Sequence, residues 1–333
     1  MKKSYILWVF ISLICFTSQA TIWRVNNQST STAVFTTVQA AIDDDRVSNG
    51  DTILIEGSPD VYSGFDVDKR LVILGSGFFL NENPKASLEG VLSVVSDYVD
   101  LLDGSQGSVI SSLVFSNSSL ATPRISVNNI WLARCYFAND VYVSDDISGL
   151  LVTENYFANK GIEYSSLASL QGTVFKNNIV KANFTILSDS NDPRTFAAVE
   201  NNLFLGDVAV TTSTYRNNIW LPLEASTINV TAGIKEYNLN VSVDMGTENN
   251  NQVINGLTDL YTGSGSTDGK WQIKSDSEYK NSGKDGTDPG PYGGSNPYVL
   301  SGLPSLPIIY EISTTGFGSA DEGLPVTIKV RSN

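Results

Sequence analysis

Five short segments of the chain repeat one pattern at intervals of 16 to 24 residues, and this repeat limits the possible folds more than any other feature. Each segment has a charged residue second, Asn or Cys third and an apolar residue fifth; the segments are residues 133–137, 153–157, 175–179, 199–203 and 215–219. A repeat of about twenty residues without a helical period is typical of a β-solenoid, because each coil must stack on its neighbours to bury its apolar side chains. We therefore predict an all-β chain whose coils stack in parallel.

Superposition of the five segments predicts a ladder of stacked polar side chains in their third column. This column contains one cysteine and four asparagines: Cys135, Asn155, Asn177, Asn201 and Asn217. A buried amide in such a stack can bond to the copies above and below it, because neighbouring strands lie about 4.8 Å apart. The fifth column is apolar and is predicted to face the interior: Phe137, Phe157, Ile179, Leu203 and Ile219.

The second column alternates in charge along the stack. Its members are Arg134, Glu154, Lys176, Glu200 and Arg216. One interpretation makes a basic member a catalytic base or an anion-binding residue. The other is a solvated ladder of opposite charges, with about 0.2–1 kcal/mol per pair. Strict alternation favours the ladder, because repulsion between neighbours requires alternation and an active site does not.

The N-terminal segment predicts export from the cell. Lys2 and Lys3 precede an apolar run over residues 5–16, and small residues end at Ala20. This pattern is typical of a cleavable secretory signal peptide over residues 1–20, too short for a membrane span, and no later segment is long and apolar enough to cross a bilayer. Cys135 is then the one remaining cysteine, so we expect a small buried side chain rather than a disulfide or a reactive thiol.

Charge and composition exclude several classes of function. The chain has 35 acidic and 21 basic residues and a formal net charge of −14, so nucleic acid is not an expected partner. A polyanionic glycan would be repelled unless divalent cations bridged the two surfaces. The chain contains no histidine, which excludes Ser-His-Asp catalysis and His-ligated zinc. Carboxylate and Lys or Arg chemistry remains.

The rest of the chain divides into three parts. Residues 21–49 combine an entry strand with a short capping helix, and residues 50–295 contain the solenoid coils. Residues 296–333 form a Pro-containing linker and a hairpin-like tail, with strands expected over 308–312 and 326–330. The tail is expected to cover one end of the solenoid, where strand edges would otherwise be exposed. A surface-docking or sorting element is the alternative.

Three stretches of the chain resemble a known class of proteins. Residues 35–42, followed by 50–53 and 71–77, look like the opening of right-handed parallel β-helix proteins of the pectin-lyase-like class. The coils over 127–221 are similar to the asparagine ladders of that class, and residues 277–294 resemble its closing turn. The resemblance covers residues 22–295 and implies a single-stranded right-handed parallel β-helix. It implies no single function, since the class includes lyases, hydrolases, epimerases and proteins without known activity.

The lyases of that class typically hold Ca²⁺ with acidic residues and use Arg or Lys as a base, so the resemblance raises the question of a cation site. The only central acidic pair is Asp145 and Asp146, with Glu163 about one coil further on. The candidate bases are Lys160, Lys181 and Arg194. No motif of a lyase or a hydrolase matches these residues, and an Asp pair beside a glycine is also ordinary turn composition.

Aromatic residues on the repeated coils offer a different function, the binding of sugars. They are Tyr136, Tyr142, Tyr156, Tyr164, Trp131 and Trp220. Exposed aromatic rings along one solenoid face would give sugar rings an apolar platform, and Tyr136 and Tyr156 are expected to point outward from successive coils. Packing in the core or in turns is the alternative.

These observations lead to one hypothesis and two alternatives. We expect a secreted or cell-surface monomer that binds or organises polysaccharide without catalysis. The first alternative is a Ca²⁺-dependent polysaccharide lyase. The second is a passive component of a surface assembly, docked through the C-terminal tail.

Overall fold

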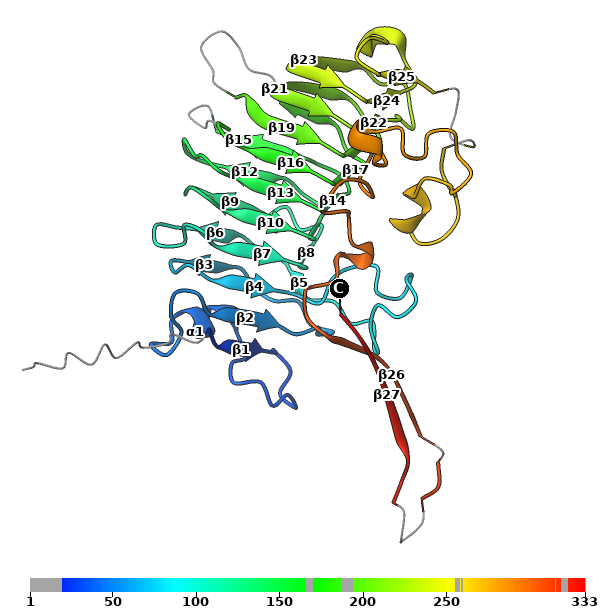
Figure 1. Ribbon diagram of the computed structural model, residues 1–333. Coiled ribbons are helices and arrows are strands. Elements are labelled where there is room, and N and C mark those ends of the chain that lie inside the picture. The colour runs from blue at the N-terminus through cyan, green and yellow to red at the C-terminus, as the bar shows by residue number, and fades with distance from the viewer. Residues whose placement is uncertain are drawn as a thin grey trace, which may run out of the picture.

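The protein is a parallel β-solenoid with a protruding C-terminal hairpin (Figure 1). The computed structural model describes residues 20–165, 170–186, 194–254, 258, 260–314, 316–318 and 323–332. Three sheets of parallel strands and one antiparallel pair contain the strands of this part of the chain, which confirms the predicted fold class. The predicted signal peptide, apart from Ala20, lies outside the described residues. No helix within the described ranges is long and apolar enough to span a membrane.

Sheet A is the largest sheet and faces the viewer in Figure 1. Its strands are β1 (Ile22–Val25), β2 (Thr52–Ile55), β4 (Val72–Leu74), β7 (Val109–Ser111), β10 (Trp131–Ala133), β13 (Leu151–Thr153), β16 (Val174–Lys176), β18 (Phe184–Ile186), β19 (Phe196–Glu200), β21 (Val208–Arg216) and β23 (Ile228–Glu236). Most are short, because each coil turns a corner after three or four residues.

Sheets B and C complete the wall of the solenoid. Sheet B contains β5 (Val94–Val95), β8 (Val114–Phe115), β11 (Tyr136–Phe137), β14 (Tyr156–Phe157), β17 (Ile179–Val180), β20 (Leu203–Phe204), β22 (Ile219–Trp220), β24 (Leu239–Asn240) and β25 (Gln252–Val253). Sheet C contains β3 (Phe65–Val67), β6 (Val99–Leu101), β9 (Pro123–Ile125), β12 (Val141–Val143) and β15 (Ile162–Tyr164).

Short helices mark the ends of the solenoid and its outer segment. Helix α1 (Val38–Ile42) begins where the Thr37 hydroxyl accepts a hydrogen bond from the Ala40 backbone N–H, and it buries its apolar face at the N-terminal end. The 3₁₀ turns are η1 (Val243–Met245), η2 (Gly269–Trp271), η3 (Lys284–Gly286) and η4 (Leu300–Gly302).

An inward column of rings and aliphatic side chains forms the core behind sheet B. Its members pair in register: Phe115, Phe137, Phe157, Val180, Phe204 and Trp220. The predicted inward positions of Ile179, Leu203 and Ile219 are wrong, because these residues pair with the outward Tyr136 and Tyr156 instead. From the third segment onward, the predicted alignment of the coils is therefore wrong by one residue.

The asparagine ladder exists, with a different membership from the predicted one. It runs through Asn155, Asn178, Asn202, Asn218, Asn238 and Asn251, and the backbone N–H of Cys135 donates to its first member. Within the ladder, Asn178 Oδ1 accepts from the backbone N–H and from the side-chain amide of Asn155, at 2.9 and 3.1 Å. The Asn178 amide donates to the Val152 carbonyl at 2.9 Å, so the polar groups of this buried turn are paired.

The predicted ladder members Asn177, Asn201 and Asn217 lie one position earlier, at the corner between sheets A and B. Their φ angles are 54°, 55° and 54°, in the left-handed region that Asn tolerates better than most residues. They make outward contacts: the Asn177 amide donates to the carbonyls of Pro291 and Gly293 at 2.9 and 2.8 Å. These asparagines therefore fasten the C-terminal segment to the solenoid.

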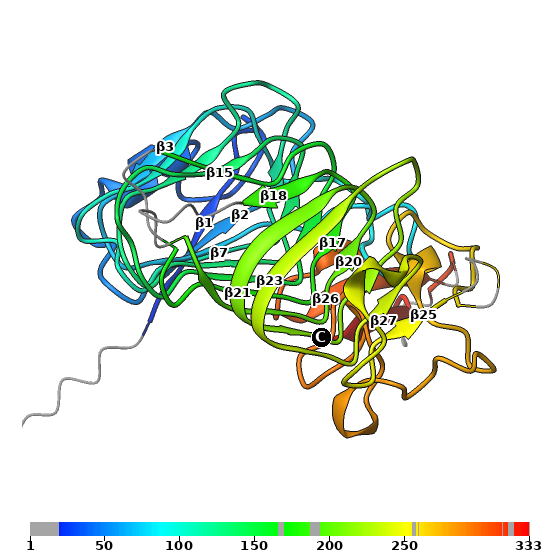
Figure 2. The same cartoon turned by 90° about the horizontal axis from the view of Figure 1, so that it is seen from above.

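A second apolar core lies outside sheet B, between the sheet and the returning C-terminal segment (residues 260–303, Figure 2). It includes Tyr156, Ile179, Leu203, Ile219, Leu260, Trp271 and Tyr298. The buried carboxylate of Asp268 links this segment to an early coil, because it accepts hydrogen bonds from the Asn83 amide at 3.0 Å and the Ser301 backbone N–H at 2.7 Å.

The tail forms an antiparallel hairpin of β26 (Ile308–Thr314) and β27 (Val326–Arg331). The predicted capping of a solenoid end is wrong: the hairpin extends past β1, beyond the N-terminal end (Figure 1). Its base packs against the molecule through Ile308, beside Leu80 and Leu303.

Candidate functional site

A cleft of about 580 Å³ lies on the outer face of sheet A, where residues 284–296 approach the strands. Its floor contains outward side chains of β10, β13, β16, β19 and β21, and its far wall includes Lys284, Thr287 and Asn296. Because the strands pair in exact register, the floor consists of two straight columns, one apolar and one charged.

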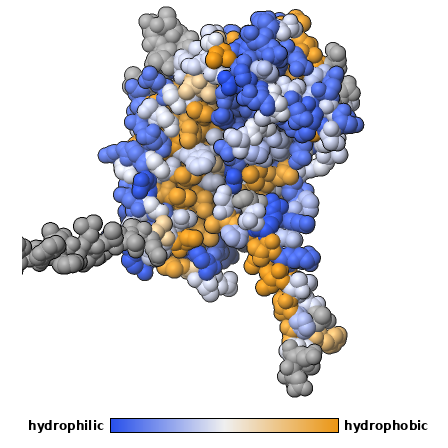
Figure 3. Space-filling view, in the orientation of Figure 1, coloured by the Kyte–Doolittle hydropathy of each residue, from blue (hydrophilic) through white to orange (hydrophobic). Residues whose placement is uncertain are grey.

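The apolar column contains Trp131, Leu151 and Val174 in register. Each is the first residue of its strand and points outward, while the next residue (Leu132, for example) points into the core. Trp131 and Leu151 are 39% and 37% exposed, and with Val174 they line the cleft as one contiguous apolar patch. The Trp131 indole N–H donates to the Thr153 hydroxyl at 2.7 Å and thereby fixes the ring on the surface. Apolar side chains form a stripe along this face in Figure 3.

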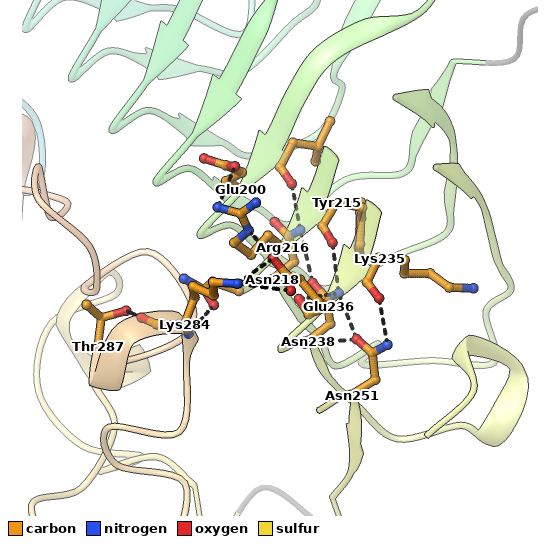
Figure 4. A network of polar contacts seen from close by, with 12 residues as sticks. Glu200, Tyr215, Arg216, Asn218, Lys235, Glu236, Asn238, Asn251, Lys284 and Thr287 are labelled. Atoms are coloured by element: carbon orange, nitrogen blue, oxygen red, sulfur yellow. Dashed lines mark hydrogen bonds and ion pairs between the residues drawn. The ribbon is translucent and has the colours of Figure 1, made fainter. Parts of the chain in front are cut away.

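The charged column contains Lys176, Glu200, Arg216 and Glu236 in register. Lys176 Nζ lies 2.7 Å from Glu200, and Arg216 Nε lies 2.9 Å from Glu236. Arg216 lies between the two carboxylates, and Lys284 approaches Glu236 at 3.2 Å (Figure 4). The prediction of a structural ladder of opposite charges is thus confirmed for this column.

Arg134 and Glu154, the other two members of the predicted charge column, occupy the adjacent corner, with φ angles of 54° and 60°. Arg134 Nε lies 2.7 Å from the Glu154 carboxylate, and its guanidinium also donates to the Leu303 carbonyl at 3.1 Å. Burial raises the pKa of Glu154, and Arg134 opposes this shift.

The cleft can therefore hold a flat ligand that is apolar on one face and polar at its edges. Trp131 and Leu151 give the apolar contact, and Thr153, Glu200 and Asn296 place hydrogen-bonding groups within the same lining. A pyranose ring has this combination of a C–H face and equatorial hydroxyl groups. Each glutamate of the cleft lies beside a cation, which leaves the lining close to neutral.

No family model, curated protein or solved structure matches the chain. Function must therefore be argued from the site itself.

Of the predicted sugar-binding tyrosines, Tyr156 is buried and its neighbour Tyr136 is half-buried. Tyr136 and Tyr156 stack on each other outside the solenoid, with ring centroids 5.6 Å apart and planes 6° apart. Phe78 and Phe79 cover them, however, and Tyr156 is only 4% exposed. The prediction of an exposed platform at this pair is wrong, because the segment after β4 folds over it.

The other two tyrosines lie on sheet C, away from the cleft. Tyr142 lines a hollow of about 270 Å³ with Arg124. Tyr164 lines a neighbouring hollow of about 570 Å³, and the Arg194 guanidinium lies 4.0 Å from its ring centroid. Both tyrosines are half-buried and border solvent, so they stay candidates for a secondary contact.

The structure does not bring the predicted Ca²⁺ ligands together. Glu163 pairs in register with Tyr142, three positions before Asp145, so the two carboxylates lie at different points along the sheet. Within the described ranges, no group of three or more Asp, Glu or Cys side chains is placed to bind a metal ion. The predicted site of Asp145, Asp146 and Glu163 is therefore not assembled.

The three candidate bases lie outside the cleft lining. Lys160 Nζ lies 2.9 Å from the Asp140 carboxylate, which raises the pKa of this lysine by hydrogen bonding and charge. A raised pKa is the opposite of what a general base requires. Lys181 is exposed, and Arg194 lies over the Tyr164 ring.

Cys135 agrees with the prediction of a small buried side chain. It is free and fully buried, and burial raises the pKa of its thiol to about 12. A thiol with such a pKa is inert as a nucleophile at neutral pH.

The sequence argument missed Leu151, Val174 and the wall formed by residues 284–296. A signal for the apolar column was present, because three consecutive strand residues such as Trp131, Leu132 and Ala133 are all apolar. Alternation along a strand then requires an apolar side chain on the outer face.

Proposed function

We propose that the chain is an exported polysaccharide-binding protein that holds a neutral glycan along the sheet A cleft and does not cleave it. The observation that carries the proposal is the in-register column of Trp131, Leu151 and Val174 beside a column of polar groups. Strand spacing of about 4.8 Å matches the length of a sugar ring closely enough for one chain to contact several coils. We also propose that the protein belongs with the pectin-lyase-like β-helices, and its parallel coils and asparagine ladder support this proposal.

A neutral glycan fits the charge of the site better than a polyuronate. The Lys176 and Arg216 side chains already pair with Glu200 and Glu236, so no cation among them is left to balance a carboxylate of the ligand. The protein as a whole carries a net charge of −14, which repels polyanions.

The experiment is affinity electrophoresis of the full chain in gels that contain one soluble neutral polysaccharide each, with a polyuronate gel for comparison. We expect retardation in at least one neutral gel, loss of most of it in Trp131→Ala and partial retention in Trp131→Tyr, which keeps an aromatic ring. Leu120→Ala is the matched control, because Leu120 is 43% exposed but lies outside the cleft. Equal retardation of wild type and Trp131→Ala would refute the cleft as the binding site.

The Ca²⁺-dependent lyase is the alternative, and it has less support because its acidic residues are not assembled. It is tested by incubation with polyuronates and Ca²⁺ while unsaturated product is followed by absorbance. Sustained product that EDTA abolishes would overturn the non-catalytic proposal. A passive structural role would instead give neither retardation nor product.

A further inference from the structure

The C-terminal hairpin has one apolar face and one polar face. Residues that pair directly in an antiparallel ladder place their side chains on the same side. The pairs Ile312 with Ile328 and Ile309 with Val330 therefore share a face, which Val326 extends. The opposite face is polar, as shown by Glu311, which pairs with Lys329 at 2.7 Å.

A β-bulge between Ile309 and Glu311 produces this segregation. Without the bulge, Ile309 and Ile312 would point to opposite sides, because side chains alternate along a strand. The extra residue moves both onto the apolar face.

The apolar face is open to solvent. Ile309, Ile312, Val326, Ile328 and Val330 are 43%, 47%, 52%, 55% and 53% exposed. Figure 3 shows an orange band along the projecting hairpin. An isolated two-stranded hairpin is at best marginally stable in water, and a contiguous exposed apolar face is typical of an interaction surface.

The hairpin is directed away from its own solenoid. Its base is held by Ile308 near Leu303 and by Lys85, whose ammonium lies 5.7 Å from the Tyr310 ring centroid. From there it runs past β1, roughly along the solenoid axis (Figures 1 and 2). The hairpin therefore projects beside the position that a second molecule would occupy in a coaxial stack.

The opposite end of the solenoid has a matching surface. Strand β23 pairs with β21, and no other described strand pairs with its second edge. Side chains at this end include Leu223, Ile234, Val241 and Val243, which are 50%, 47%, 38% and 72% exposed. Turn η1 lies at this end as well (Figure 1, top).

We propose that the apolar face of the hairpin docks on a second copy of this chain, at the end of the solenoid that carries β23 and η1. The contact joins two different surfaces, so it is heterologous and leads to head-to-tail chains of molecules rather than closed dimers. This replaces our expectation of a monomer, and it does not depend on the glycan proposal.

The test uses one variant for each surface. Ile312→Glu damages the hairpin face, and Val243→Glu damages the receiving end. Sedimentation velocity of the wild type should show concentration-dependent oligomers, and each variant alone should be monomeric. Thr327→Glu, on the polar face of the hairpin, is the control and should still assemble.

A mixture of the two damaged variants gives the decisive result. Each retains one intact surface, so together they should form a dimer with 1:1 stoichiometry and nothing larger. Circular dichroism of each variant verifies that the solenoid is folded. A monomeric wild type at its solubility limit would overturn the proposal. So would binding of that monomer to phosphatidylcholine vesicles through Ile312, which would assign the hairpin to a lipid surface.

Discussion

The side-chain carbonyl of Asn202 accepts two hydrogen bonds from Asn178, one from the backbone N–H at 2.9 Å and one from the side-chain amide at 3.0 Å. The Asn202 amide donates in turn to the Phe175 carbonyl at 2.9 Å. One side chain thus serves three polar groups of a neighbouring buried turn, and the same arrangement repeats along the ladder.

Replacement of Asn202 by Ala should destabilise the protein substantially. The change leaves the Asn178 N–H, the Asn178 amide and the Phe175 carbonyl without this partner, and each orphaned buried group costs about 1–3 kcal/mol. Urea unfolding should show a lower midpoint. Asn296→Ala, in an exposed turn, is the control and should unfold with the wild type. Similar midpoints for all three proteins would contradict the role of the ladder.

Replacement of Cys135 by Asn should be tolerated. Cys135 occupies the first position of the ladder column, and its sulfur already lies 3.7 Å from the Ile110 carbonyl, where an amide would donate. The new side chain adds one rung, as Asn155 does on the next coil. In thermal unfolding, Cys135→Asn should be at least as stable as Cys135→Ala, which creates a small cavity. A lower melting temperature for Cys135→Asn than for Cys135→Ala would show that the ladder cannot be extended to this coil.

Asp51 should give a stability that disappears in acid. Burial opposes its ionisation, but hydrogen bonds from the Thr21 N–H, the Ser48 N–H and the Trp23 indole lower its pKa overall. A lowered native pKa gives stability that is present above the unfolded pKa of about 3.9 and is lost as pH falls through the native pKa. Asp51→Asn should therefore lower the unfolding free energy by about 2 kcal/mol at neutral pH. The difference in unfolding free energy between the variant and the wild type should disappear at low pH. A difference that does not change with pH would contradict this account.

Glu154 should show the opposite pH dependence. Its native pKa is raised, because burial outweighs the effect of Arg134. The native state then binds this proton more tightly than the unfolded state, so wild-type stability falls as pH rises through the range above the ordinary Glu pKa of about 4.3. Glu154→Gln lacks this loss and should be the more stable protein at neutral pH, measured by urea unfolding. Greater stability of the wild type at neutral pH would show that the Arg134 ion pair dominates.

The sequence predicted the repeat and its ladder, and it failed at the exact register. Asn155 was placed correctly, but the doubled asparagines Asn177 and Asn178 offered two superpositions that differ by one residue. The superposition that aligns the charged residues is the wrong one. Strand alternation distinguishes the two, since it places Phe175 inward and Lys176 outward.

The cleft wall and the outer core could not be predicted from the sequence, because they depend on contacts between residues far apart in the chain. Asn83 contacts Asp268 and Ser301, which are 185 and 218 positions away in the chain. Such contacts leave no periodic trace in the sequence, whereas coil-to-coil pairing does. Tyr156 was correctly placed outside the solenoid, but nothing near it in sequence indicates that Phe79 covers it.

The returning segment also fixes how many coils the protein can have. In an array whose repeats contact only their neighbours, units can be added or removed with modest effect. Here the returning segment contacts several coils at once. Its hydrogen bonds join Lys284 to Asn217, Pro291 to Asn177 and Ser301 to Asn83. Insertion or deletion of a coil would move these partners apart and break all of the hydrogen bonds at once. Length variation among natural relatives of this protein should therefore be confined to loops.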